Sequence, residues 1–97
     1  MIIRVVRMYF KEEGVESFLA TFNLHKEAIR SFPGCTHLEL LKDAKDPNVF
    51  STLSYWIDED SLENYRKSDL FNSVWGNVKK LFSEKPQAFS LMKFIKV

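Results

Sequence analysis

Hydrophobic positions along the chain follow a strand period in some segments and a helix period in others. Residues 2–10 are dense in Ile, Val, Met, Tyr and Phe, which favours a β-strand. Both faces of this segment are largely apolar, with Arg4 on one face and Arg7 on the other. A strand that is apolar on both faces is typical of the middle of a sheet, so we expect a central strand here.

A helical period follows and ends at a Pro-Gly pair. An amphipathic stripe predicts a helix, and its apolar members are Val15, Phe18, Leu19, Phe22 and Ile29. Phe32 precedes Pro33 and therefore avoids the helical region, while Gly34 can turn freely. The helix is therefore expected to stop at this point.

Three further segments predict strands. Residues 36–42 and 49–57 form a hairpin across the polar turn at 46–48, where a proline presets one backbone angle. Pro86 ends the helical region that follows. Residues 88–97 alternate in part, so we expect them to form the last strand.

Two capping residues divide the second helical region. Asp58 can cap a helix over residues 59–67, and Ser68 can cap a second helix. The apolar residues of that second helix are Leu70, Phe71, Val74, Trp75, Val78, Leu81 and Phe82. The order β-α-β-β-α-β predicts an α+β fold of the ferredoxin-like kind, with a four-stranded antiparallel sheet and helices on one face. No linker or repeat is visible, so residues 1–97 are expected to form one domain.

The second face of such a sheet has no helices to cover it. Alternation along the strands assigns eight apolar residues to that face: Ile2, Val6, Met8, Phe10, Leu41, Val49, Leu53 and Ile57. A patch of this size is rarely left in water, which favours a homodimer formed through the sheet face. The alternative is that the alternation is assigned to the wrong face and some of these residues lie under the helices.

Composition narrows the class of protein. The formal net charge is +1, with 14 basic and 13 acidic residues interspersed, so no nucleic-acid partner is indicated. The single cysteine excludes an internal disulfide. No apolar run approaches the roughly 20 residues that span a bilayer, and the N-terminus lacks a signal-peptide pattern, so we expect a cytoplasmic protein without a membrane partner.

One stretch of motifs resembles a known family. The residues that carry the resemblance are Phe32-Pro33-Gly34-Cys35, Leu38, Leu40, Asp46-Pro47, Phe50, Trp56, Leu62, Tyr65, Ser68 and Phe71. This pattern resembles the antibiotic biosynthesis monooxygenase (ABM) family. The resemblance implies a homodimer whose two sheets close into a dimeric α+β barrel. It also implies one of two activities: cofactor-free oxidation of quinols and phenols, or haem degradation.

The family's functional positions match this chain in one place. Trp56 stands where phenol-oxidising members have the tryptophan that lines the pocket, but the family's Asn, Tyr and Arg are replaced by Thr52, Leu62 and Gly76. The positions that haem-degrading members use for Asn, Trp and His are occupied by Arg7, Tyr65 and Trp75. No histidine follows His37. Haem degradation is therefore not expected, since an imidazole usually holds the iron.

The residues themselves suggest a pocket for a flat ligand. Trp56 shares strand parity with Thr52 and Ser54, whose hydroxyls need partners if they are buried. Tyr65 and Trp75, together with Phe71, could sandwich an aromatic or lipophilic small molecule. The alternatives are that the hydroxyls bond to the backbone or to each other, and that the aromatic residues form ordinary core.

Two further residues are candidates for chemistry. His25 borders the apolar stripe of the first helix and is the best general base available, or else a boundary residue with a satisfied hydrogen bond. Arg7 on a central strand calls for an anion, either a substrate group or an acidic side chain in a salt bridge.

The resemblance to the ABM family implies, as the first hypothesis, a cofactor-independent monooxygenase that oxidises a small quinol or phenol with O₂. His25 would remove the phenolic proton, and Arg7 or nearby hydroxyls would stabilise the electron-rich anion as it reduces O₂. Neither a metal nor an organic cofactor is expected. The alternative is a non-catalytic dimeric protein that binds a small aromatic or lipophilic molecule.

Overall fold

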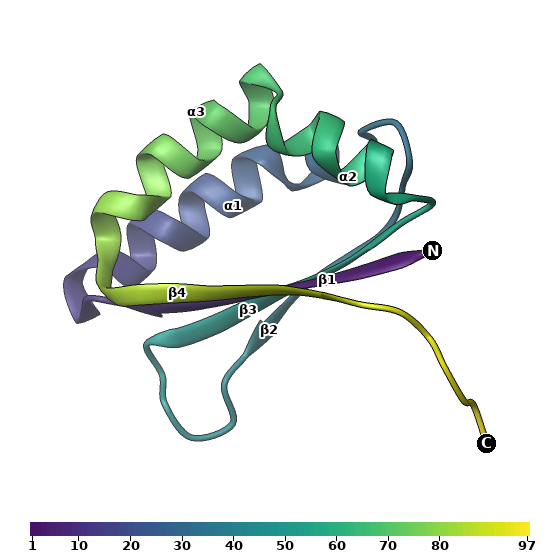
Figure 1. Ribbon diagram of the computed structural model, residues 1–97. Coiled ribbons are helices and arrows are strands. Elements are labelled where there is room, and N and C mark those ends of the chain that lie inside the picture. The colour runs from purple at the N-terminus through teal and green to yellow at the C-terminus, as the bar shows by residue number, and fades with distance from the viewer.

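In the computed structural model, which describes residues 1–97, a layer of helices lies on one face of a sheet (Figure 1). The elements in chain order are β1 (Ile2–Phe10), α1 (Val15–Arg30), β2 (Cys35–Lys42), β3 (Val49–Trp56), α2 (Glu59–Arg66), α3 (Asp69–Val78) and β4 (Phe82–Leu91). Short 3₁₀ turns, η1 (Glu12–Gly14) and η2 (Lys79–Leu81), precede α1 and follow α3. No helix is long and apolar enough to cross a membrane.

The sheet has the strand order β2-β3-β1-β4, and every neighbouring pair is antiparallel. β1 is a central strand, as its two apolar faces predict: Val6 lies between Thr52 of β3 and Ala88 of β4. All three helices lie on the same side (Figure 1). This arrangement confirms the predicted ferredoxin-like α+β fold.

The predicted caps divide the second helical region as expected. The Asp58 carboxylate accepts a hydrogen bond from the backbone N–H of Ser61 (2.8 Å) at the start of α2. The Ser68 hydroxyl accepts one from the N–H of Phe71 (3.1 Å) at the start of α3. Each side chain replaces a partner that the first turn of a helix lacks, so the chain can change direction between the two helices.

The position of the last strand differs from the prediction. β4 covers Phe82–Leu91 rather than residues 88–97, and the residues after Leu91 leave the sheet (Figure 1). Pro86 lies inside β4 instead of ending the preceding region. β4 is an edge strand, and its pairing with β1 shifts register between Arg7 and Tyr9, where the strand accommodates a residue that cannot donate a hydrogen bond.

The assignment of β1 to the two faces is also wrong. Ile2, Val6, Met8 and Phe10 face the helices, where Met8 and Phe10 belong to one core cluster and Ile2 to another. The uncovered face of β1 carries the odd-numbered residues instead, and Val5 pairs there with Leu53 of β3. Alternation shows which residues share a face, but both faces of β1 are apolar, so it could not show which face the helices cover.

Candidate functional site

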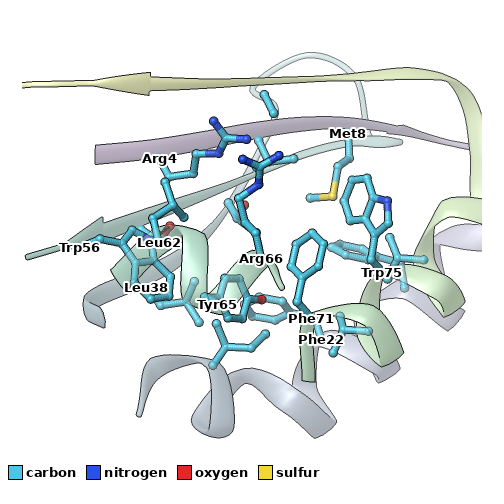
Figure 2. Close-up of a pocket in the computed structure, with 18 residues that line it drawn as sticks. Arg4, Met8, Phe22, Leu38, Trp56, Leu62, Tyr65, Arg66, Phe71 and Trp75 are labelled. Atoms are coloured by element: carbon cyan, nitrogen blue, oxygen red, sulfur yellow. Dashed lines mark hydrogen bonds between the residues drawn. The ribbon is translucent and has the colours of Figure 1, made fainter. Parts of the chain in front are cut away.

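A cavity of about 310 Å³ lies between the sheet and the helices (Figure 2). Its lining takes residues from both core clusters, Met8, Phe18 and Val78 from one and Trp56 and Leu62 from the other. Of the 18 residues that line it, 14 are hydrophobic. A mostly apolar cavity of this size, with a few polar groups, is typical of sites that bind small molecules.

β3 supplies one wall of the cavity. Thr52, Ser54 and Trp56 all face the helices and line the cavity, as their shared parity predicts. Trp56 is 1% exposed, and its indole N–H donates to the Ser54 hydroxyl (3.0 Å). The Ser54 hydroxyl is thus satisfied by a neighbouring side chain, which fixes the orientation of the indole ring.

Four aromatic rings form a continuous series along the cavity. Trp56 stacks on Tyr65 with ring centroids 5.0 Å apart, and Tyr65 meets the edge of Phe71 at 5.2 Å. Phe71 then stacks on Trp75 at 5.7 Å. These rings pack on one another as a core would, and all four still line the cavity. These aromatic residues are therefore both part of the packed core and part of the cavity wall.

Tyr65 supplies a polar group within this apolar wall. Burial raises the pKa of Tyr65 to about 12, so the phenol stays neutral at physiological pH. Every fully buried side-chain nitrogen or oxygen in the chain has a hydrogen-bond partner. The Tyr65 hydroxyl forms none of the side-chain hydrogen bonds of the chain, and Tyr65 lines the cavity, so this hydroxyl is available to donate to a ligand.

Two arginines that the sequence did not indicate as site residues also line the cavity. Arg4 extends from β1 and Arg66 from α2, and their guanidinium groups lie on the same side of the cavity (Figure 2). The argument applied to Arg7, that a cation on a central strand needs an anion, holds equally for Arg4. Arg66 gave no such signal, because an arginine three residues after Glu63 is usual on an exposed helix.

The structure places Arg7 on the opposite face of the sheet. Its guanidinium forms an ion pair with Asp43 (3.1 Å) and donates to the Tyr9 hydroxyl (2.9 Å). These two hydrogen bonds, led by the one to Tyr9, raise the pKa of Arg7. The salt-bridge alternative for Arg7 is thus the arrangement found, and Arg7 does not line the cavity.

His25 does not line the cavity either, although Phe22, one turn earlier on α1, does. The His25 ring N–H donates to the backbone carbonyl of Thr21 (2.9 Å). This is the boundary position with a satisfied hydrogen bond that the sequence left open. The structure therefore brings six of the eight predicted site residues together at the cavity: Thr52, Ser54, Trp56, Tyr65, Phe71 and Trp75.

The cavity offers no histidine, cysteine or carboxylate as a ligand. No group of three or more His, Cys, Asp or Glu side chains in the chain could hold a metal ion. The lining therefore lacks the imidazole that haem iron usually takes as its protein ligand.

The comparisons with known proteins agree with the fold. The sequence model of the family described as antibiotic biosynthesis monooxygenase matches residues 1–74 of this chain. No curated protein matches the chain significantly.

Solved structures match over nearly the whole chain. A conserved protein from Methanosarcina mazei Go1 is 23% identical, with a TM-score of 0.90 over 97% of this chain and 94% of that one. A structure described as an antibiotic biosynthesis monooxygenase is 19% identical, with a TM-score of 0.91 over 98% and 100%. Rv0793 from Mycobacterium tuberculosis is 15% identical, with a TM-score of 0.89 over 98% and 96%. At these identities the likeness establishes the fold.

Proposed function

Because the chain belongs to the antibiotic biosynthesis monooxygenase family, we propose that it oxidises a small quinol or phenol with O₂ in the cavity, without a cofactor. The observation that supports this proposal is the cavity itself. Its wall of four aromatic rings suits a flat aromatic substrate, and its apolar lining would exclude water from the reacting centre.

The reaction requires an electron-rich anion and no added reductant. The phenol would lose its proton to bulk water as it enters the cavity, because no carboxylate or imidazole lines the cavity to accept it. The neutral Tyr65 hydroxyl would donate a hydrogen bond to the phenolate oxygen and favour the anion. The phenolate would pass electrons to O₂, a ring carbon would bond to the oxygen to form a hydroperoxide, and loss of water would leave a quinone. One phenol and one O₂ thus give one quinone and one water.

Oxygen consumption tests this proposal directly. We expect O₂ uptake with naphthohydroquinone or a related phenol, with no added flavin or metal, and incorporation of one atom from isotopically labelled O₂. Tyr65→Phe should lower kcat by roughly 10²-fold, the usual cost of removing one oxyanion donor. Tyr55→Phe, on the uncovered face, is the matched control and should leave kcat unchanged.

His25→Ala tests the base predicted from sequence. Since His25 does not line the cavity, we expect its loss to leave turnover unchanged. A large fall in kcat would restore His25 as the base. If neither naphthohydroquinone nor any related phenol supports O₂ uptake, the oxygenase proposal is refuted.

A second candidate function is binding without catalysis. It is favoured by the same lack of a carboxylate or imidazole in the lining, since either group could serve as a general base. In that case aromatic compounds would bind to the wild-type protein and be recovered unchanged under O₂.

We also propose that the uncovered sheet face joins two copies of the chain. Phe89 and Leu91 on β4 are 45% and 47% exposed, and Val5 and Leu53 lie beside them at the centre of that face. A second copy would bury this apolar surface. Light scattering at micromolar concentration should report a dimer, and Leu53→Glu should give a monomer. Leu24→Glu, on the exposed surface of α1, is the control that should remain dimeric.

A further inference from the structure

Arg4 is a cation within an apolar row. The other residues of β1 that face the helices, Ile2, Val6, Met8 and Phe10, belong to the two core clusters or pack against them. The Arg4 guanidinium donates to the Ser90 hydroxyl (3.1 Å) and takes part in none of the ion pairs of the chain. Burial, followed by the charge of Arg66, lowers the pKa of Arg4, and the Glu63 carboxylate acts in the opposite direction. A partly buried guanidinium that forms no ion pair and shares one carboxylate with other cations would be stabilised by an anion that completes the site.

Positive charge exceeds negative charge at this end of the cavity. Arg66 pairs with Glu63 (3.2 Å), and the same carboxylate lies 3.9 Å from the Lys67 ammonium. The Glu63 carboxylate therefore serves three cations, since it also acts on Arg4, whose guanidinium lies next to that of Arg66 (Figure 2). The repulsion between the two guanidinium groups would be relieved by an anion placed between them.

Paired surface arginines often bind nothing, because exposed charges are well solvated. Two features distinguish this pair. Arg4 projects from the inner face of a central strand, and both guanidinium groups line a cavity whose remaining walls are mostly apolar and aromatic. A ligand that fits both parts needs a flat apolar body and an anionic group at one end.

We propose that Arg4 and Arg66 bind the carboxylate of an aromatic acid whose ring lies in the cavity beside Tyr65, Phe71 and Trp75. A carboxylate presents two coplanar oxygens that match the donor fork of a guanidinium, whereas a phenolate presents one. A cavity of about 310 Å³ is at the small end of ligand sites and fits one or two fused rings. This inference rests on the proposed function for its aromatic ligand and narrows the substrate class to hydroxylated aromatic carboxylic acids.

The strand register gives the ligand a direction. Arg4 pairs with Ser54 across the sheet, and Met8 pairs with Phe50 four residues further along β1. The two guanidinium groups therefore lie between Trp56 on one side and Met8 and Trp75 on the other (Figure 2). A carboxylate held by the arginines would direct the hydroxylated ring towards Trp75.

Binding of a matched pair of compounds tests the inference. The probes are a hydroxynaphthoate and its primary carboxamide, which have the same rings and nearly the same size but differ in charge. The chain has two tryptophans, and both line the cavity, so intrinsic fluorescence and calorimetry report occupancy independently of turnover. We expect wild-type protein to bind the acid about tenfold tighter than the amide, as a charge-assisted pair would give.

Substitutions assign the preference to the two arginines. Arg4→Gln and Arg66→Gln should each weaken binding of the acid about tenfold and leave binding of the amide unchanged. Lys67→Gln removes a neighbouring cation that does not line the cavity and should change binding of either probe less than about twofold. Arg4→Lys keeps the charge but not the fork, and an intermediate loss is expected.

Equal affinity of the wild-type protein for acid and amide would overturn the inference, even if an arginine variant failed to fold. So would an acid preference that survives both Gln substitutions. If naphthohydroquinone is oxidised while acid and amide bind equally, the proposed function stands and the carboxylate site does not. If the acid binds with the expected arginine dependence but no phenol is oxidised, the site stands and the oxygenase reaction does not.

Discussion

Arg4 and Arg7 lie three residues apart on the same strand and point to opposite faces of the sheet. On the uncovered face, Arg7 forms an ion pair with Asp43, and their side chains are 38% and 21% exposed. On the covered face, Arg4 has the Ser90 hydroxyl as its partner, a second guanidinium beside it and an aromatic cavity in front of it. Residue type and element are the same, so the difference comes from what each face meets.

This contrast separates a structural arginine from a ligand-binding one. Arg7 is satisfied within the chain by the turn that joins β2 and β3. Arg4 is positioned but forms no ion pair of its own and shares the Glu63 carboxylate with Arg66 and Lys67, which leaves it able to bind an anionic ligand. The uncovered face, by contrast, carries apolar side chains that no helix covers. Each of the following experiments compares the two faces or alters what covers them.

The largest expected difference is in packing energy. Phe10 is 2% exposed and lies against Phe18 with ring centroids 4.2 Å apart, so Phe10→Ala should cost about 3–5 kcal/mol of unfolding free energy. Phe89 on the uncovered face is 45% exposed within one copy of the chain, so Phe89→Ala should cost less than about 1.5 kcal/mol at protein concentrations low enough to keep the chain monomeric. Urea unfolding at fixed protein concentration measures both. Equal losses would show that the two faces are equally buried in solution.

The next effect concerns the turn that holds α2 over the covered face. Gly34 has φ of 90°, and a Cβ there would collide with Ser61 of α2, so Gly34→Ala should cost about 1–3 kcal/mol. Gly76→Ala is the matched control: a Cβ there meets nothing within 4 Å on α3, and a gain of about 0.5–1 kcal/mol is expected. Thermal unfolding distinguishes them. If Gly34→Ala leaves the unfolding free energy unchanged, α2 can shift without cost.

A smaller effect should appear at acid pH on the uncovered face. The backbone N–H groups of Asp46 and Lys45, followed by Arg7, hold the pKa of Asp43 below its usual range. A depressed carboxyl pKa stabilises the fold above the unfolded-state value of about 3.9, and this contribution is lost as the pH falls further. Asp43→Asn should therefore flatten the loss of stability below about pH 4. Arg7→Gln should keep most of the loss of stability below about pH 4. If Arg7→Gln removes this pH dependence instead, Arg7 is the main cause of the low Asp43 pKa.

The smallest effect is spectroscopic and concerns the covered face. Tyr65, with its pKa raised to about 12, should ionise in a late phase of an alkaline absorbance titration. A raised phenol pKa means that stability is present below the unfolded-state value of about 10 and is lost as the pH rises towards 12. Tyr65→Phe should remove the late phase, and Tyr55→Phe should retain it. A late phase that persists in Tyr65→Phe would contradict the assigned burial.

The sequence predicted most elements closely because their signals are local. The β-forming residues of β1, the caps at Asp58 and Ser68 and the Pro-Gly stop after α1 all act within a few residues. The predicted position of β4 is wrong because Pro86 indicates the end of an element. A proline is tolerated inside a strand where that strand lies at a sheet edge, as β4 does. Edge position is a property of the sheet and not of the segment.

The site was predicted in part for the same reason. Thr52, Ser54 and Trp56 share a face because alternation requires it, and Tyr65, Phe71 and Trp75 follow the helical period. Arg4 lies on a strand and Arg66 on a helix, 62 positions apart in the sequence, and no local sequence pattern links them. Arg7 was chosen in place of Arg4 because the two are equivalent until one face is covered.

The sequence by itself determined the elements, their order, the family and the set of residues that share each face of β3. Backbone preferences, caps and side-chain periodicity act over a few residues and can be read along the chain. The tertiary structure decided which face of the sheet the helices cover, and hence which arginine meets the cavity and which apolar residues remain exposed. Because both faces of the central strand are hydrophobic, that choice depends on how the crossing helices pack.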